Sequence, residues 1–173
     1  MAARVKGAIE LRKALRQFEP NLLKETNKEI ASFLKPVVKQ ARGFLPSNAD
    51  APSGWLKREN AGGRWATRYY DQAEASRGIS YRTSPSKENR KGWVSLATIY
   101  STNPGGAIYE TAGRKSGITG RFTPKLGGQL EGRSQKMTGR AMFRAYAKDQ
   151  GKATAGVVKA IEKASATFKR KTR

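Results

Sequence analysis

The sequence has 173 residues, contains no cysteine and no histidine, and carries 35 Lys and Arg against 13 Asp and Glu, a net charge of +22. These absences exclude a thiol nucleophile, a disulfide framework, a Cys/His zinc site and a Ser-His-Asp arrangement. No acidic motif has the spacing that holds Mg²⁺ or Ca²⁺, so we expect neither a metal nor a cofactor. The charge indicates an acidic partner, and the length suits one domain over residues 1–173.

The first 46 residues predict two helices. The apolar residues of the first are spaced by three and four and share one face: Ala8, Leu11, Leu15 and Phe18. A longer pattern of the same kind predicts a second helix over residues 21–44. Pro36 falls inside this pattern and should bend the helix, and Pro46 should end it.

Residues 47–76 show no clear periodicity and are rich in Gly, Ser, Asn and Pro, which predicts a long flexible loop. The loop contains Trp55 and Trp65. We interpret them as anchors that pack the loop against the body of the protein, with base stacking as the functional alternative. Strands are predicted at 78–83 and 92–101, joined by a polar hairpin loop.

The stretch "GGAIYETAGRKSG" (105–117) allows three interpretations: a phosphate-binding loop, a nucleic-acid-binding loop or a framework segment. The glycine spacing does not match a P-loop, so nucleotide binding is disfavoured. As framework, Ile108 and Tyr109 would belong to the core, Glu110 would be a structural ion-pair partner, and Gly113 would be a turning point. An enzyme would need Glu110 combined with a distant carboxylate such as Asp71 or Glu74.

A basic, glycine-rich loop is predicted over residues 113–139, and its length indicates function or disorder until a partner is met. The candidate residues for contacting a neighbouring protein or DNA are Arg114, Lys115, Arg121, Phe122, Lys125, Arg133 and Lys136. A last amphipathic helix is predicted over residues 140–169, followed by a basic tail at 169–173. The predicted fold class is therefore α+β: a small antiparallel sheet flanked by long N- and C-terminal helices.

No continuous apolar run indicates a signal peptide or a membrane span, so we expect no membrane association. The charge excess is spread along the chain, whereas a dedicated nucleic-acid-binding tail would be more segregated.

The order of these elements resembles the tail-completion or head–tail joining (neck) proteins of long-tailed bacteriophages. Three segments carry the resemblance: "VVKQARGFLP" (37–46), with Ala41 and Pro46 matching an A-x-x-x-x-P pattern, the Ile108-Tyr109-Glu110 signature followed by Gly113, and "GRAMFRAYAKD" (139–149). The resemblance implies a small α+β subunit that forms a ring, typically of six copies, between tail tube and head connector. It also implies no catalysis, no cofactor and no small-molecule substrate.

Two hypotheses follow. The leading one is a non-enzymatic virion structural protein, made in the host cytoplasm and assembled into the neck, with phage connector and tail-tube proteins as neighbours. This hypothesis also allows the ring to contact genomic DNA that passes through its lumen. The alternative is a nonspecific nucleic-acid-binding basic protein, whose affinity would fall steeply with salt.

Overall fold

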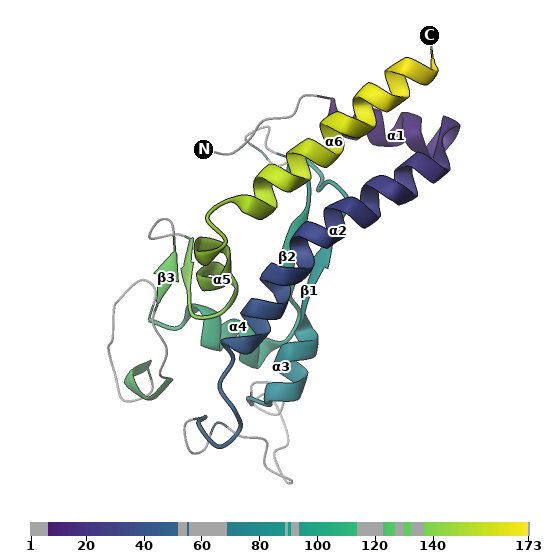
Figure 1. Cartoon of the computed structure of the whole chain (residues 1–173). Coiled ribbons are helices and arrows are strands. Elements are labelled where there is room, and N and C mark those ends of the chain that lie inside the picture. Colours follow the sequence, from purple (N-terminus) through teal and green to yellow (C-terminus); the bar gives the residue numbers. More distant parts are fainter. Residues whose placement is uncertain are drawn as a thin grey trace. The chain divides into compact units, whose positions relative to one another are not determined.

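The computed structural model describes residues 7–51, 55, 69–88, 90, 94–113, 123–126, 130–132 and 137–172. The fold is mixed α+β and mostly helical: the described residues contain six α-helices and two two-stranded sheets (Figure 1). The fold class predicted from the sequence is thereby confirmed. By its internal contacts the chain divides into two compact units. Unit 1 comprises Met1–Pro36, Tyr81–Thr98 and Gly151–Arg173, and unit 2 comprises Val37–Ser80 and Ile99–Gln150.

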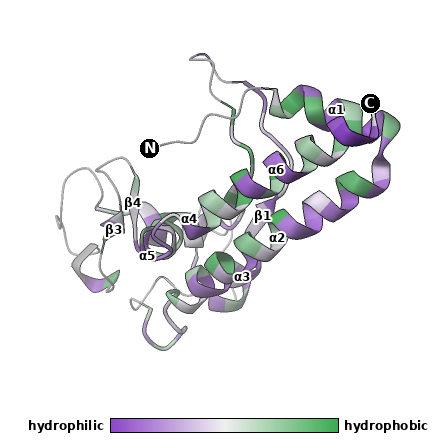
Figure 2. Ribbon diagram, turned by 45° about the horizontal axis from the view of Figure 1, so that its top comes forward, coloured by the Kyte–Doolittle hydropathy of each residue, from purple (hydrophilic) through white to green (hydrophobic). Residues whose placement is uncertain are grey.

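Unit 1 is built on three helices: α1 (Ala8–Phe18), the first part of α2 (Pro20–Gly43) and α6 (Lys152–Lys171). Apolar and polar residues alternate around each of them, as expected for helices with one buried face (Figure 2). Their buried side chains form the core of the unit: Ala8, Leu15, Ile30, Leu34, Val157, Ala160, Ile161 and Ala164. Helix α6 approaches α2 closely at Gly156, where a Cβ atom would collide with the Phe33 ring. A small residue at this position therefore permits the helix contact.

Unit 2 contains the end of α2, followed by α3 (Gln72–Gly78), α4 (Pro104–Thr111), a short 3₁₀ helix η2 (Thr123–Leu126) and α5 (Met142–Lys148). Strands β3 (Glu131–Gly132) and β4 (Thr138–Gly139) pair antiparallel, with Glu131 opposite Gly139. Helix α5 contacts both of these strands, and α4 contacts α3 and β4. Strands β1 (Ile79–Arg82) and β2 (Thr98–Ser101) form the other sheet, and each strand crosses from one unit to the other along the chain.

The long second helix and the first strand match their predicted positions closely. Helix α2 covers Pro20–Gly43 and keeps Pro36 inside it. Strand β1 lies within the predicted range 78–83. These elements follow from local patterning, since the apolar spacing and the bounding prolines are visible in the sequence.

Four predicted elements need correction. The range 113–139, predicted as a loop, contains η2 and the paired strands β3 and β4. The single helix expected over 140–169 is two helices, because Gln150 and Gly151 have φ values of 53° and 85° and end α5 in the left-handed region. The second strand begins at Thr98, later than the predicted 92. Residues 47–76 are not loop throughout, since α3 begins at Gln72 after the Asp71 side chain accepts a hydrogen bond from the Glu74 backbone N–H at 2.8 Å.

None of the described helices is long and apolar enough to cross a bilayer.

Candidate functional site

The candidate site lies in unit 2 and starts from α4, whose local sequence explains its position. Asn103 precedes the helix, and its side-chain oxygen accepts a hydrogen bond from the Gly106 backbone N–H at 2.7 Å. Pro104 occupies the first turn, where its missing N–H costs nothing. Gly105 is buried, and a Cβ there would lie 2.5 Å from the Tyr69 carbonyl oxygen. The helix is thus fixed tightly and carries two buried side chains, Tyr109 and Glu110.

Glu110 caps the N-terminus of α5. Its side chain is 2% exposed, and its carboxylate accepts hydrogen bonds from the backbone N–H groups of Ala141, Met142 and Phe143 at 2.7, 3.0 and 2.8 Å. These N–H groups have no partner within the helix, and a carboxylate at a helix N-terminus is also favoured by the helix dipole. Gly139 leaves room for the carboxylate, because a Cβ at this position would collide with it.

Arg140 caps the C-terminal end of α4. It is 3% exposed, and its Nη1 donates to the carbonyl oxygens of Tyr109 and Ala112 at 3.0 and 2.6 Å, at the C-terminal end of α4. Its guanidinium lies 5.9 Å from the centre of the Tyr109 ring. Burial lowers the pKa of Arg140, and the neighbouring Tyr109 and Glu110 oppose that shift. Glu110 of α4 therefore caps α5, while Arg140, two residues before α5, caps α4.

The end of α2 joins the same cluster through tyrosine hydroxyls. Tyr109 donates to the Phe44 carbonyl oxygen at 3.2 Å, and Tyr70 donates to that of Pro46 at 2.7 Å. Burial raises the pKa of both phenols, because a phenolate would be poorly solvated there. Trp55 is buried and stacks on Tyr70 with a centroid distance of 4.9 Å. This confirms the interpretation of Trp55 as an anchor; Trp65 lies outside the described residues.

We call Tyr109, Glu110, Arg140 and the backbone of residues 141–143 the Glu110 junction. Its hydrogen bonds run mostly to backbone groups, so the arrangement holds three helix ends in place. The carboxylates considered for catalysis have separate partners: Asp71 caps α3, and Glu74 accepts from the Tyr69 hydroxyl. Among the described residues, no three His, Cys, Asp or Glu side chains are grouped so as to hold a metal ion.

The predicted site residues are distributed as follows. Glu110 caps a helix, and its charge also acts on the neighbouring Arg140 guanidinium. Gly113 has a φ of 80°, in the left-handed region that glycine adopts readily. Lys125 is exposed in η2. The remaining members of the candidate loop lie outside the described residues: Arg114, Lys115, Arg121, Phe122, Arg133 and Lys136.

Sequence reasoning singled out neither Arg140 nor Tyr70 as a functional or structural site residue. The available signal was the Gly139-Arg140 pair directly before an apolar helical pattern, which places a small residue and a cation at a helix start. Comparisons of the chain with protein-family models, with curated proteins and with solved structures find no match.

Proposed function

We propose that the chain is a non-enzymatic structural subunit of a phage particle, forming a ring in the neck or tail-completion complex between tail tube and head connector. One observation carries the proposal: the three segments on which the family resemblance rests meet at the Glu110 junction. Tyr109 of the central signature bonds to Phe44 in the first segment, and Glu110 bonds to residues 141–143 in the third. The three segments, although far apart in sequence, therefore contact one another in the structure. Segments that together define a family fold are expected to do so.

The chemistry of the junction also supports a structural role. Its buried carboxylate and guanidinium are engaged with backbone groups, and such satisfied networks stabilise one arrangement of a core. The proposed partners are further copies of the chain and the connector and tail-tube proteins above and below it. A positive surface would mainly set the encounter rate and the register with acidic neighbours.

The proposal is tested in the phage that encodes the chain, by disrupting its gene and complementing in trans. We expect mass spectrometry to find the protein in complete particles. Without it, electron microscopy should show heads and tails that fail to join, and the complementing copy should restore joined particles. Infectious particles of normal appearance made without the protein would refute the proposal.

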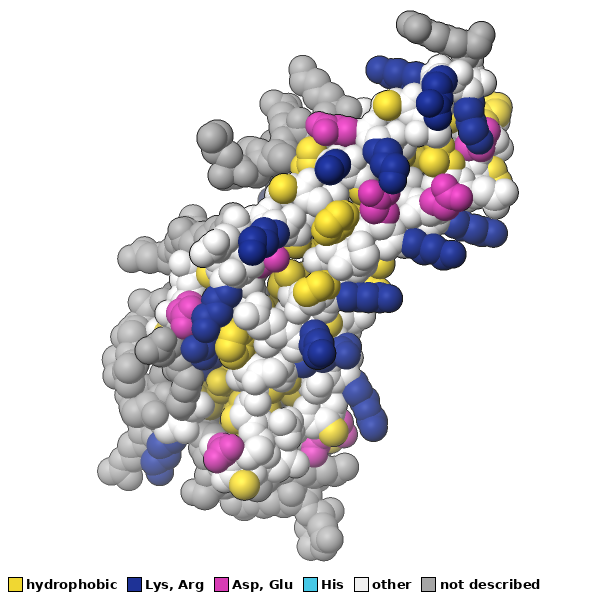
Figure 3. Space-filling view, viewed as in Figure 1, with side chains coloured by type: hydrophobic (Ala, Val, Ile, Leu, Met, Phe, Trp, Pro, Cys, Tyr) yellow, Lys and Arg dark blue, Asp and Glu magenta, His cyan; other side chains and the backbone are white. Residues whose placement is uncertain are grey.

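Nonspecific nucleic-acid binding is the second candidate, and the net charge of +22 favours it. Unit 1 includes 19 Lys and Arg against 6 Asp and Glu, and unit 2 includes 16 against 7, so both units carry a large positive charge. Lys and Arg side chains project along α2 and α6 in Figure 3, interspersed with acidic ones. Electrophoretic shifts at two salt concentrations test this candidate. Binding that is saturable and weakens steeply with salt would support it, and no binding at low salt would exclude it.

A further inference from the structure

The part of α2 that belongs to unit 1 carries three exposed lysines on one face: Lys24, Lys28 and Lys35. Because an α-helix turns by about 100° per residue, their side chains leave α2 within an arc of about 40° and along about 16 Å of its axis. Phe33 leaves the helix on the opposite side, where α6 approaches α2 at Gly156. We call the three residues the α2 lysine row. They lie on the outer side of the helix, and Figure 3 shows Lys and Arg side chains projecting outward along α2.

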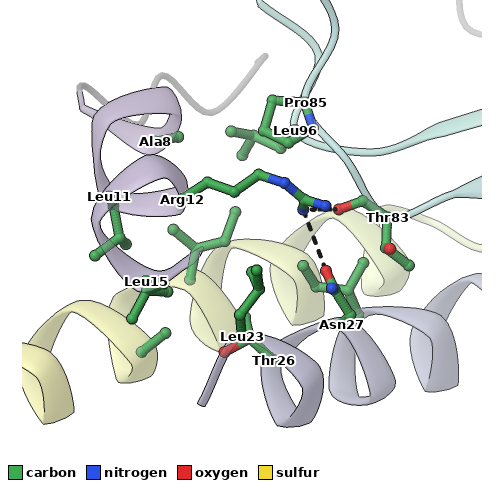
Figure 4. A pocket seen from close by; sticks show the side chains of 13 residues that line it. Ala8, Leu11, Arg12, Leu15, Leu23, Thr26, Asn27, Thr83, Pro85 and Leu96 are labelled. Atoms are coloured by element: carbon green, nitrogen blue, oxygen red, sulfur yellow. Dashed lines mark hydrogen bonds between the residues drawn. The ribbon is translucent and has the colours of Figure 1, made fainter. Parts of the chain in front are cut away.

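Arg12 is a cation of unit 1 that its own unit satisfies. It lies across a small apolar pocket between α1 and the segment that follows β1 (Figure 4). Its Nη1 donates to the Asn27 side-chain oxygen at 3.2 Å and to the Thr83 carbonyl oxygen at 3.1 Å. Arg12 therefore holds three parts of unit 1 together.

Two lysines of α6 are also engaged within unit 1. Lys163 forms an ion pair with Glu29 at 3.2 Å, and Lys171 forms one with Glu19 at 3.0 Å. In the part of the chain that the structure describes, no acidic side chain forms a salt bridge with the α2 lysine row. These two acids of unit 1 thus neutralise α6, and the row keeps its charge.

The row also works against the stability of its own helix. Lys24 and Lys28 are four residues apart, the spacing at which like charges on a helix repel each other. Glu25 lies three residues before Lys28 but forms no ion pair with it. The first turn of α2 contains no acidic residue, although the helix dipole favours one there. Residues that break such local rules without a compensating contact are candidates for a function.

We propose that the α2 lysine row binds the phosphate backbone of duplex DNA without reading its sequence. Duplex DNA carries about one negative charge per 1.7 Å of its axis, so a row about 16 Å long meets several phosphates in any register. A protein partner would have to hold several acidic side chains in a row against their own repulsion, whereas a phosphate backbone has this arrangement by its covalent structure. The inference rests on the second candidate function, nucleic-acid binding, and deepens it by naming the surface.

The test compares two variants that lose the same number of charges from unit 1. The row variant combines Lys24→Gln, Lys28→Gln and Lys35→Gln. The control variant combines substitutions of exposed lysines on α6 that form no ion pair among the described residues: Lys152→Gln, Lys159→Gln and Lys169→Gln. Fluorescence anisotropy measures the binding of each chain to short DNA duplexes of two unrelated sequences over a range of salt concentrations.

The salt dependence separates contact with phosphates from the general attraction of a basic protein. For the row variant, the slope of the logarithm of the binding constant against that of the salt concentration should fall in magnitude by about 2–3. Its dissociation constant at about 0.1 M salt should rise at least about 10-fold for both duplexes. The control variant should keep the slope of the unsubstituted chain. Equal changes in the two variants would overturn the proposal.

Two further measurements test the chemistry of the surface. Replacing the same three lysines by arginine keeps the charge, so affinity and slope should both be retained; a loss as large as that of the row variant would overturn the proposal. Polyglutamate at equal charge concentration should compete weakly with the duplex. Competition as strong as that of unlabelled duplex would overturn the assignment to nucleic acid and favour an acidic protein.

Thermal unfolding checks that the row variant is folded. Its melting temperature should stay the same or rise, because glutamine and lysine have similar helix propensities and the repulsion between Lys24 and Lys28 is removed. A clear fall would show that the row stabilises the helix, and would overturn the argument for a function.

The inference and the function on which it rests fail separately. If the unsubstituted chain does not bind the duplexes at low salt, both are overturned. If it binds them and the row variant keeps its affinity and slope, the α2 surface is overturned and nucleic-acid binding stands on another surface.

Discussion

Replacing Glu110 by glutamine tests whether its carboxylate is the element that organises unit 2. Oε2 accepts from Ala141 and Met142, and Oε1 accepts from Phe143. If the glutamine oxygen takes the place of Oε2, its amide nitrogen faces the Phe143 N–H as a second donor. That N–H then loses its partner inside a buried site, because Glu110 is 2% exposed.

The expected cost follows from these contacts. A buried N–H without a partner costs about 1–3 kcal/mol, and each of the two remaining hydrogen bonds weakens by about 1 kcal/mol when its acceptor loses its charge. The free energy of unfolding should therefore fall by about 3–5 kcal/mol. A chain of this length loses about 2–4 °C in melting temperature per kcal/mol, so we expect a drop of about 10 °C.

The assay should observe unit 2 by itself. Trp55 stacks on Tyr70 in this unit, so its fluorescence reports unit 2 in a background where Trp65 and Trp93 are replaced by phenylalanine. Glu74→Gln is the matched control, since Glu74 is exposed in the same unit. Urea unfolding of the two variants gives both free energies. A loss below about 1 kcal/mol for Glu110→Gln, or one equal to that of the control, would refute the capping role.

Three further predictions concern packing and pH. Gly139→Ala should lower the melting temperature by about 5 °C, because its Cβ collides with the buried Glu110 carboxylate, whereas Gly43→Ala, with open space around it, should change it little. Gly156→Ala should destabilise unit 1 in a thermal melt although alanine favours helix by about 1 kcal/mol, since its Cβ meets the Phe33 ring; a stabilised variant would contradict this packing. Burial raises the pKa of Tyr70, so the stability from its neutral phenol is present below about pH 10 and is lost as the pH rises further. Tyr70→Phe should reduce the alkaline loss measured by urea unfolding at about pH 8 and pH 11, and an unchanged loss would refute the assignment.

The positions of the helices could be predicted where the information is local. The three- and four-residue spacing of apolar side chains defines one face of a helix, and this spacing located α1 and α2. The absence of cysteine and histidine likewise excludes whole classes of chemistry on composition alone. A cap at Asp71 with Glu74 three residues later is also local, and closer attention to it would have located α3.

The break between α5 and α6 was not evident, because the apolar spacing continues across it. Gly151 was visible as a weak helix former, but a glycine can stay within a helix or end one. In the structure, the left-handed φ values of Gln150 and Gly151 end α5. The late start of β2 has a similar origin, because residues 94–97 have an apolar pattern without strand pairing.

The Glu110 junction required the tertiary structure. The sequence marked Glu110 as a lone carboxylate in a basic chain, which favours an ion pair, but it did not show that the carboxylate accepts hydrogen bonds from backbone N–H groups some thirty residues further along. Every helix begins with backbone N–H groups that have no partner within the helix, so the sequence does not show which helix a distant carboxylate will cap. The path of the chain in the tertiary structure decides this. The sequence alone located α1 and α2 and excluded chemistry that needs cysteine or histidine, because both depend on local spacing or composition. Tertiary packing decided the partners of the buried Glu110 and Arg140 side chains.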